Sequence, residues 1–318
     1  MISSRTIQFL EYFEIISNWS SVVLDNYFYK IFPPFSEFSE IVTGEKTMKV
    51  QVAESSNSIA GGQFISSVNK LCLSGEGEQK YVTFDCEGVN LSRLGTVEVV
   101  SICFSPTNVF IVDFGGGNPD TDIVGAVKKL FEDTRVIKII HDARMDCDAL
   151  FHLHNITLNN VHDTSCFHKE ITGQQDKNLN YVLTYNGIEE NCVRDSNVYK
   201  KNEAYWRTRP FTMEMISWAS SDVDKLFEVA SKQLKLCSLS QKTCALKNSA
   251  KNTVVARDME VKSGLTVSSP GLFIGRGGSN IRTLQRQTGT LIYGSRGNWF
   301  VYYDNKLSLA SVEREMRR

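Results

Sequence analysis

Several features that would direct the interpretation of this 318-residue sequence are missing from it. No uninterrupted apolar run approaches the roughly 18 residues that a membrane span needs, so no membrane partner is expected. The first ten residues lack the charged-then-apolar pattern of a secretory signal, which favours an intracellular protein, cytoplasmic or nuclear. The eight cysteines include no C-x-x-C pair and no zinc-finger spacing with histidine. We therefore expect reduced, mostly buried thiols rather than a disulfide framework or a zinc site.

Net charge is nearly absent as well, but the charges are unevenly distributed. Thirty-five Lys and Arg against 36 Asp and Glu leave a net charge of −1. Residues 247–318 carry 12 basic against 5 acidic side chains, a balance of +7, which leaves 23 against 31, a balance of −8, for residues 1–246. An acidic front and a basic tail indicate a polyanionic partner. With 42% apolar and 10% aromatic residues the chain can bury a core, and its length fits two domains.

Hydrophobic patterning divides the chain into four segments. Residues 1–45 show no recognisable chemistry and stay unassigned, whereas residues 237–256, rich in Ser, Lys, Asn and Thr, are expected to form a linker. Within residues 46–236, three strand-like runs with short gaps indicate antiparallel neighbours, and helical and extended segments then alternate. This order predicts an α/β fold, a mixed sheet with helices on both faces, followed by a small α+β domain at 257–318. The expected strands are 81–86, 96–104, 109–114, 136–140 and 161–166, and the expected helices are 62–73, 119–133, 146–154, 179–185 and 212–234.

Acidic side chains occupy three of these segments. Asp85 and Glu87 end the first strand, and residues two apart on a strand point to the same side, which makes a good seat for hard Mg²⁺. Asp146 follows strand 136–140, where open α/β sheets place ligands. Asp222 follows Trp218 by four in a helix, so both face one side. Alone, the Asp85 and Glu87 pair is as consistent with a solvated strand edge, and Asp222 fits a solvated helix face better than a site. The order and context of the three segments together favour a site.

In their order and context these segments resemble a known family. Asp85-Cys86-Glu87, His141 followed five residues later by Asp146, and Trp218-x-x-x-Asp222 preceded by Arg209-Pro210 are similar to the motifs of the DnaQ-like, ribonuclease H-like 3′→5′ exonuclease domains. The branch is the ribonuclease D type, with four acidic ligands (DEDD). The run His141–Asp148 is particularly similar to the Exd1/Egalitarian-like subgroup. The resemblance covers residues 46–236 and implies a ribonuclease H-like mixed sheet.

The resemblance also implies two-metal hydrolysis of phosphodiester bonds. Asp85, Glu87, Asp146 and Asp222 would hold two Mg²⁺ or Mn²⁺ ions about 3.5–4 Å apart. Where the branch has Tyr this chain has Trp218, whose indole N–H can only donate a hydrogen bond, although its ring could stack on a terminal base. A slow or altered exonuclease, normal activity with Ser217 or Ser221 orienting the water, and a lapsed enzyme kept for binding all remain open. His141 could contact the substrate, with a structural, hydrogen-bonded role as the alternative.

The basic tail carries a second motif. Gly275-Arg276-Gly277-Gly278 is not a dinucleotide fingerprint, because the third glycine would fall on Asn280. Residues 271–294 instead resemble a K homology (KH) domain, whose Gly-x-x-Gly loop and flanking helices grip about four nucleotides of single strand. Ile281 and Leu284 would face the small core. Arg276, Arg282 and Arg286 would reach the sugar-phosphate chain. The alternative is a glycine turn in an unrelated small domain.

Both resemblances lead to one predicted function and one rival. The predicted function is a metal-dependent 3′→5′ exonuclease acting on single-stranded RNA (or DNA), with a KH module gripping the strand. RNA is expected over DNA because both resembled families mostly serve RNA. The rival is a catalytically weakened or inactive RNA-binding adaptor that retains the exonuclease fold as a platform for protein partners. Trp218 favours the rival, and the four carboxylates favour the enzyme.

Overall fold

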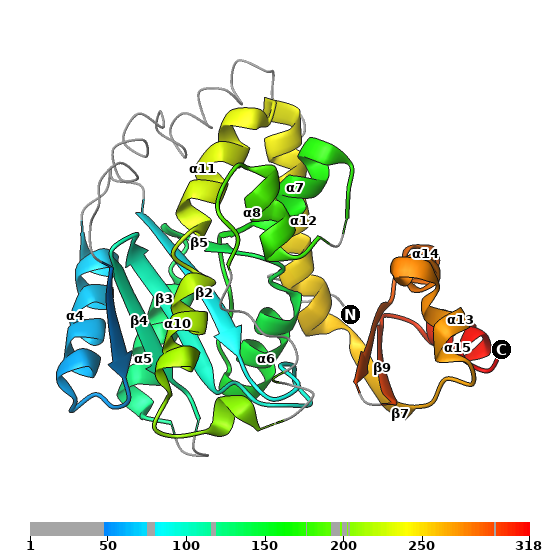
Figure 1. Cartoon of the computed structure of the whole chain (residues 1–318), viewed down its shortest axis with the longest axis horizontal. Coiled ribbons are helices and arrows are strands. Elements are labelled where there is room, and N and C mark those ends of the chain that lie inside the picture. The colour runs from blue at the N-terminus through cyan, green and yellow to red at the C-terminus, as the bar shows by residue number, and fades with distance from the viewer. Residues whose placement is uncertain are drawn as a thin grey trace, which may run out of the picture.

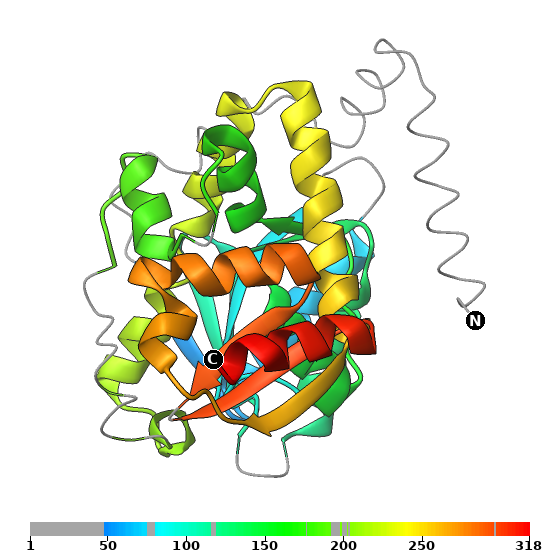
Figure 2. The same cartoon turned by 90° about the vertical axis from the view of Figure 1, so that its right-hand side faces the viewer.

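The computed structural model describes residues 48–74, 80–115, 119–175, 177–191, 198, 202, 204–295 and 297–318. The unassigned segment 1–45 lies outside this part of the chain. Two units are visible in Figure 1: a larger one built around a twisted sheet, and a smaller one formed by the C-terminal residues. The smaller unit lies to the right of the larger one in Figure 1 and in front of it in Figure 2, which is turned by 90°.

The larger unit contains a six-stranded mixed sheet in the order β1-β4-β3-β2-β5-β6. As predicted, β2 (Lys80–Glu87), β3 (Val99–Ser105) and β4 (Asn108–Asp113) form an antiparallel meander. β5 (Val136–Ile140) runs parallel to β2, and β6 (Val161–Asp163) runs parallel to β5. The edge strand β1 (Lys49–Ala53), parallel to β4, was not predicted, although alternating Val and polar residues in KVQVA are a short signal for it.

Helices cover both faces of this sheet, as the α/β prediction requires (Figure 1). One core lies between the sheet and α4 (Ile59–Leu73), α5 (Thr121–Glu132) and α6 (Arg144–His154). The other lies between the sheet and α8 (Leu179–Tyr185), α10 (Met213–Ser221) and α11 (Leu226–Leu236). Phe84 of β2 belongs to the first core and Tyr81 to the second, because successive strand side chains alternate between faces. The mixed sheet with helices on both faces is confirmed.

Two predicted elements have different boundaries. The strand expected at 161–166 ends at Asp163, whose side chain accepts the backbone N–H of Ser165 and caps α7 (Thr164–Thr172). The helix expected at 212–234 is two helices, α10 and α11. Between them the carbonyl of Val223 accepts a hydrogen bond from the buried hydroxyl of Thr83 at 2.7 Å. In both places a side chain forms a hydrogen bond with a backbone group and so sets where the element ends, which hydrophobic periodicity does not reveal.

The structure also corrects the expectation of a linker at 237–256, because α12 (Leu239–Asp258) occupies this segment. Ala245, Ser249 and Thr253 recur every fourth residue and are buried against α6, α7 and β6. The backbone N–H of Asp163 donates to Ser249 Oγ at 3.1 Å. Large apolar groups are scarce in this helix because small side chains let it approach its neighbours closely. Composition therefore made a packed helix look like a linker.

The C-terminal unit has a three-stranded antiparallel sheet in the order β7-β9-β8. Three helices pack on it around a small core, which Ile281 and Leu284 join as predicted. Tyr302 attaches the unit to the larger one, since its hydroxyl donates to Asp148 of α6 at 3.2 Å. The elements are β7 (Glu260–Leu265), α13 (Pro270–Ile274), α14 (Ser279–Thr288), β8 (Leu291–Ser295), β9 (Asn298–Tyr303) and α15 (Lys306–Met316).

Within the described residues, no helix combines the length and the apolar character that crossing a bilayer requires. The seven cysteines in this part of the chain are free thiols, and all except Cys244 are buried. Cys192 lies outside the described residues.

Candidate active site

A cleft of about 680 Å³ opens where β2 ends and α6 begins. All four carboxylates predicted as metal ligands line it: Asp85, Glu87, Asp146 and Asp222. They come from β2, from the first turn of α6 and from the C-terminal end of α10. Segments that are distant in sequence therefore meet in one hollow.

Three of these carboxylates form a tight cluster. Oxygen atoms of Asp85, Glu87 and Asp222 all lie within 4.8 Å of one another. Glu87 and Asp222 are buried and Asp85 is half-buried, so their charges repel one another with little screening by water. Oxygens on opposite sides of one Mg²⁺ lie about 4.2 Å apart, twice the Mg–O distance of about 2.1 Å. The donor set and its spacing fit a hard divalent cation.

The fourth carboxylate, Asp146, lines the same cleft but faces the end of β2. Its Oδ1 accepts the backbone N–H of Cys86 at 2.9 Å, and the residue is buried. Burial, with the nearby charge of Asp142, raises the pKa of Asp146 to about 7. The turn that leads to it is held by Asp163, whose carboxylate accepts the N–H groups of Asp142 and Ala143. Asp146 must lose a proton before it can bind a cation.

Two supporting residues were not predicted. Asn191, which is buried, donates from Nδ2 to Asp222 Oδ1 at 2.8 Å and fixes the orientation of that carboxylate. Thr83 lies two residues before Asp85 on the same face of β2 and holds the turn that follows Asp222. A Thr at that spacing, ahead of an acidic pair, was the available signal, whereas the position of Asn191 depends on a long-range contact.

Trp218 does not face the cleft. Its side chain is 1% exposed and packs in the core against Trp206, with ring centres 5.7 Å apart. A ring that stacks on a base needs an exposed face, so this burial does not support the expectation that Trp218 stacks on a terminal base. The serines proposed as substitutes for Tyr do not line the cleft either, and Ser221 Oγ donates back to the carbonyl of Trp218.

His141 lines the cleft, but both of its ring nitrogens are engaged. Nδ1 lies 2.9 Å from Thr164 Oγ1, and Nε2 lies 2.9 Å from the carbonyl oxygen of Lys177. These contacts favour the structural role over substrate contact. Next to it, Asp142 adopts φ +63° and forms a two-point ion pair with Arg144 at 2.6 and 2.8 Å.

The residues predicted to bind a strand in the tail lie around the turn between α13 and α14. Gly275, Gly277 and Gly278 all have positive φ angles, and a Cβ on Gly275 would approach the side chain of Asn280 to 2.5 Å. Arg276 and Arg286 are exposed, and Arg282 is half-buried. The loop therefore presents backbone and cations to solvent.

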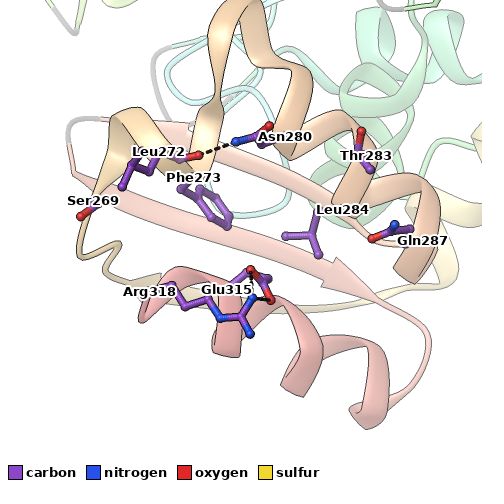
Figure 3. A pocket seen from close by; sticks show the side chains of 9 residues that line it. All are labelled: Ser269, Leu272, Phe273, Asn280, Thr283, Leu284, Gln287, Glu315 and Arg318. Atoms are coloured by element: carbon purple, nitrogen blue, oxygen red, sulfur yellow. Dashed lines mark hydrogen bonds and ion pairs between the residues drawn. The ribbon is translucent and has the colours of Figure 1, made fainter.

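A separate pocket of about 350 Å³ lies among the helices of the tail (Figure 3). Phe273 and Leu284 point into it, and Asn280 Nδ2 donates to the carbonyl of Leu272 at 2.7 Å (Figure 3). An ion pair between Glu315 and Arg318 lies at its edge. None of the predicted strand-binding residues lines this pocket.

The fold and the cleft define an exonuclease-like α/β protein with a carboxylate site at the end of its central strand. The 3′-5′ exonuclease family matches residues 65–238, more than half of the chain, and the chain belongs to this family. Among curated proteins no sequence matches it.

Solved structures share its fold. RNase D of Escherichia coli, described as an exoribonuclease, has a TM-score of 0.52 and 14% identity over 66% of this chain and 51% of its own. RNase D of Trypanosoma brucei has a TM-score of 0.55 and 18% identity over 65% and 72%. Brucella melitensis NrnC, bound to pGG, has a TM-score of 0.50 and 16% identity over 67% and 92%. The chain thus spans about half the length of the E. coli protein.

Proposed function

We propose that this protein is a metal-dependent 3′→5′ exonuclease that degrades single-stranded RNA from its 3′ end. The observation that carries the proposal is the cluster of Asp85, Glu87 and Asp222 oxygens within 4.8 Å of one another in an open cleft. Membership of the exonuclease family and the likeness to an exoribonuclease support the reaction and the choice of RNA.

All four carboxylates act as metal ligands in this proposal. Two divalent ions, Mg²⁺ or Mn²⁺, would when bound lower the pKa of a water and neutralise charge on the leaving oxygen. Asp85, Glu87 and Asp222 supply oxygen ligands, with Asn191 holding Asp222 in one orientation. Asp146 joins them once its carboxyl group is ionised. Because its pKa is about 7, we expect cation binding to compete with protons near neutral pH.

The tail would grip the strand as a KH module. Its element order, with the glycine loop between α13 and α14 and a three-stranded antiparallel sheet, supports this proposal. Positive φ angles at Gly275, Gly277 and Gly278 let the backbone approach phosphates, and the N-terminus of α14 adds a positive end. Arg276, Arg282 and Arg286 would contact the sugar-phosphate chain. Placement in the Exd1/Egalitarian-like subgroup belongs to the same proposal.

A second function, an RNA-binding adaptor, is favoured by the buried Trp218. In the resembled branch that position carries Tyr, whose hydroxyl can accept and donate hydrogen bonds, whereas here an indole lies inside the core. Ser217 and Ser221, which adjoin it in α10, do not line the cleft. Such a protein would bind strands without cleaving them, or would cleave them slowly.

A 3′-end degradation assay separates the two functions. A 5′-labelled 12-nucleotide RNA is incubated with the full chain in Mn²⁺ or in EDTA, beside the variants Asp85→Asn and Asp122→Asn. The first removes one charge from the cluster, and the second removes an exposed charge from α5. The enzyme gives a ladder from the 3′ end that is lost in EDTA and in Asp85→Asn and kept in Asp122→Asn. Binding with no ladder under any condition would favour the adaptor.

A further inference from the structure

The cleft that contains the carboxylates is lined by cations on its other sides. Lys169 of α7 and Lys251 of α12 both line it, and Lys177, just before α8, lies between them in the sequence. α7 and α12 pack against each other at one side of the sheet (Figure 1). The helix that composition suggested was a linker therefore forms part of the wall of the active-site cleft.

Two of these ammonium groups lack an acidic partner in the part of the chain that the structure describes. Within the described residues, neither Lys169 nor Lys251 donates a hydrogen bond or forms an ion pair through Nζ. Other lysines of the protein do form ion pairs, such as Lys232 with Glu228 at 2.8 Å and Lys262 with Glu313 at 2.7 Å. Lys177 differs, because its Nζ lies 4.3 Å from the ring centre of Tyr181. The unpaired cations share the cleft with the acidic cluster but are not neutralised by it.

A cleft with a carboxylate cluster and separate, unpaired lysines suits one kind of ligand. A phosphodiester chain carries a negative charge at every nucleotide, so one phosphate can lie at the cation site while its neighbours meet the ammonium groups. An acidic peptide would be repelled by the carboxylates, and a neutral ligand would gain nothing from the lysines. Exposed Lys251 and half-buried Lys169 can both reach a strand in the cleft.

We propose that Lys251, with Lys169 on the neighbouring helix, binds the backbone phosphates of the nucleic-acid strand whose 3′ end lies at the carboxylates. Helix α12 is then part of the substrate-binding site and connects it to the tail unit, because β7 begins two residues after α12 ends. This inference rests on the proposed function. It adds residues that bind substrate without taking part in the chemistry.

The test compares two lysines of one helix. Lys242 lies nine residues before Lys251, which places it about 180° away around α12, and it does not line the cleft. Full-length Lys251→Gln, Lys251→Arg, Lys169→Gln and Lys242→Gln are prepared in the Asp85→Asn background to prevent cleavage. Fluorescence anisotropy with a labelled 12-nucleotide single-stranded RNA, without divalent metal, gives Kd at several salt concentrations. Circular dichroism checks that each variant is folded.

Losing one phosphate contact of a single strand removes about 0.7 from the slope of log Kd against log salt. At 0.1 M salt this corresponds to about a fivefold higher Kd, since 10 to the power 0.7 is about 5. We expect that change for Lys251→Gln and Lys169→Gln, and little change for Lys251→Arg and Lys242→Gln. Equal Kd values and slopes for Lys251→Gln and Lys242→Gln would overturn the proposal, as would the absence of RNA binding by the parent protein.

Steady-state kinetics is then measured with variants that keep Asp85. It distinguishes failure of the lysine contact from failure of the proposed exonuclease function. A phosphate contact away from the reacting bond raises KM and leaves kcat nearly unchanged in Lys251→Gln. An active nuclease with unchanged KM in this variant would refute the lysine contact and leave the exonuclease intact. An inactive parent protein whose RNA binding still weakens in Lys251→Gln would refute the exonuclease and leave the contact intact.

Discussion

Asp148 allows a quantitative test of how the two units are joined. It is fully buried in α6, and its Oδ1 accepts a hydrogen bond from Arg93 Nε at 2.7 Å and forms an ion pair with Arg93 Nη2 at 2.6 Å. Its Oδ2 accepts the backbone N–H of Arg93 at 2.7 Å and the hydroxyl of Tyr302 at 3.2 Å. Arg93 Nη1 also donates to the carbonyl of Met259, between α12 and β7. The perturbation is Asp148→Ala, alone and with Tyr302→Phe.

The expected magnitude follows from these contacts. Asp148→Ala leaves the Arg93 side chain, which is 15% exposed, without its counter-charge, and breaking a buried ion pair costs about 3–5 kcal/mol. Tyr302→Phe removes one long hydrogen bond to a charged acceptor, worth about 1 kcal/mol. In the double variant the hydroxyl has already lost its acceptor. The two effects should therefore fall short of additivity by about 1 kcal/mol.

Urea denaturation followed by tryptophan fluorescence measures these changes. Trp206 and Trp218 report on the larger unit and Trp299 on the tail, so Asp148→Ala should also separate one transition into two. Tyr303→Phe is the matched control, because its hydroxyl donates to Glu260 within the tail at 2.8 Å. It should be additive with Asp148→Ala. A loss below about 1 kcal/mol for Asp148→Ala, or full additivity with Tyr302→Phe, would refute the reasoning.

Three further outcomes are expected. The pKa of Asp146 is about 7 when folded and near 4 when unfolded, so its contribution to stability is present below pH 4 and lost as pH rises through 7. Thermal unfolding in EDTA should show the wild type losing about 2.6 kcal/mol relative to Asp146→Asn between pH 5 and 8, and a pH-independent difference would contradict this. Thr83→Val should cost about 1 kcal/mol, because the Val223 carbonyl loses the shorter of its two hydrogen bonds and keeps the one from the backbone N–H of Leu226 at 3.3 Å. It should also weaken Mn²⁺ binding measured by calorimetry, with half-buried Thr107→Val near neutral as the control. Gly275→Ala should reduce RNA binding and tail stability more than Gly289→Ala. Of these two positions, both with positive φ, only Gly275 places the added Cβ against a neighbouring side chain. Equal losses of RNA binding and of stability in the two variants would speak against that geometry.

Much of the fold was predictable because its signals are local. β5 matches the predicted range, and the β2–β3–β4 meander follows from three apolar runs with short gaps. The four carboxylates could also be proposed from motif order, and all of them line one cleft. Alternation along β2 correctly places Asp85 and Glu87 on one side.

Other features depended on contacts between distant segments. α12 looked like a linker because a helix that packs through Ala245, Ser249 and Thr253 needs no large apolar stripe. Trp218 lies in α10 and Asp222 caps the C-terminal end of that helix, yet Trp218 is buried in the core while Asp222 lines the cleft. Periodicity predicts on which face of a helix a residue lies, but it does not predict what packs against that face.

By itself the sequence determined the α/β class, the acidic residues and the glycine loop, because strand alternation, helix periodicity and turn chemistry act over a few residues. Only the tertiary structure decided how the carboxylates are oriented and what surrounds them. The hydrogen bonds Thr83–Val223, Cys86–Asp146 and Asn191–Asp222 join residues 31 to 140 positions apart. Such bonds form only after the sheet and helices pack, since packing is what removes competing water and fixes both partners in place.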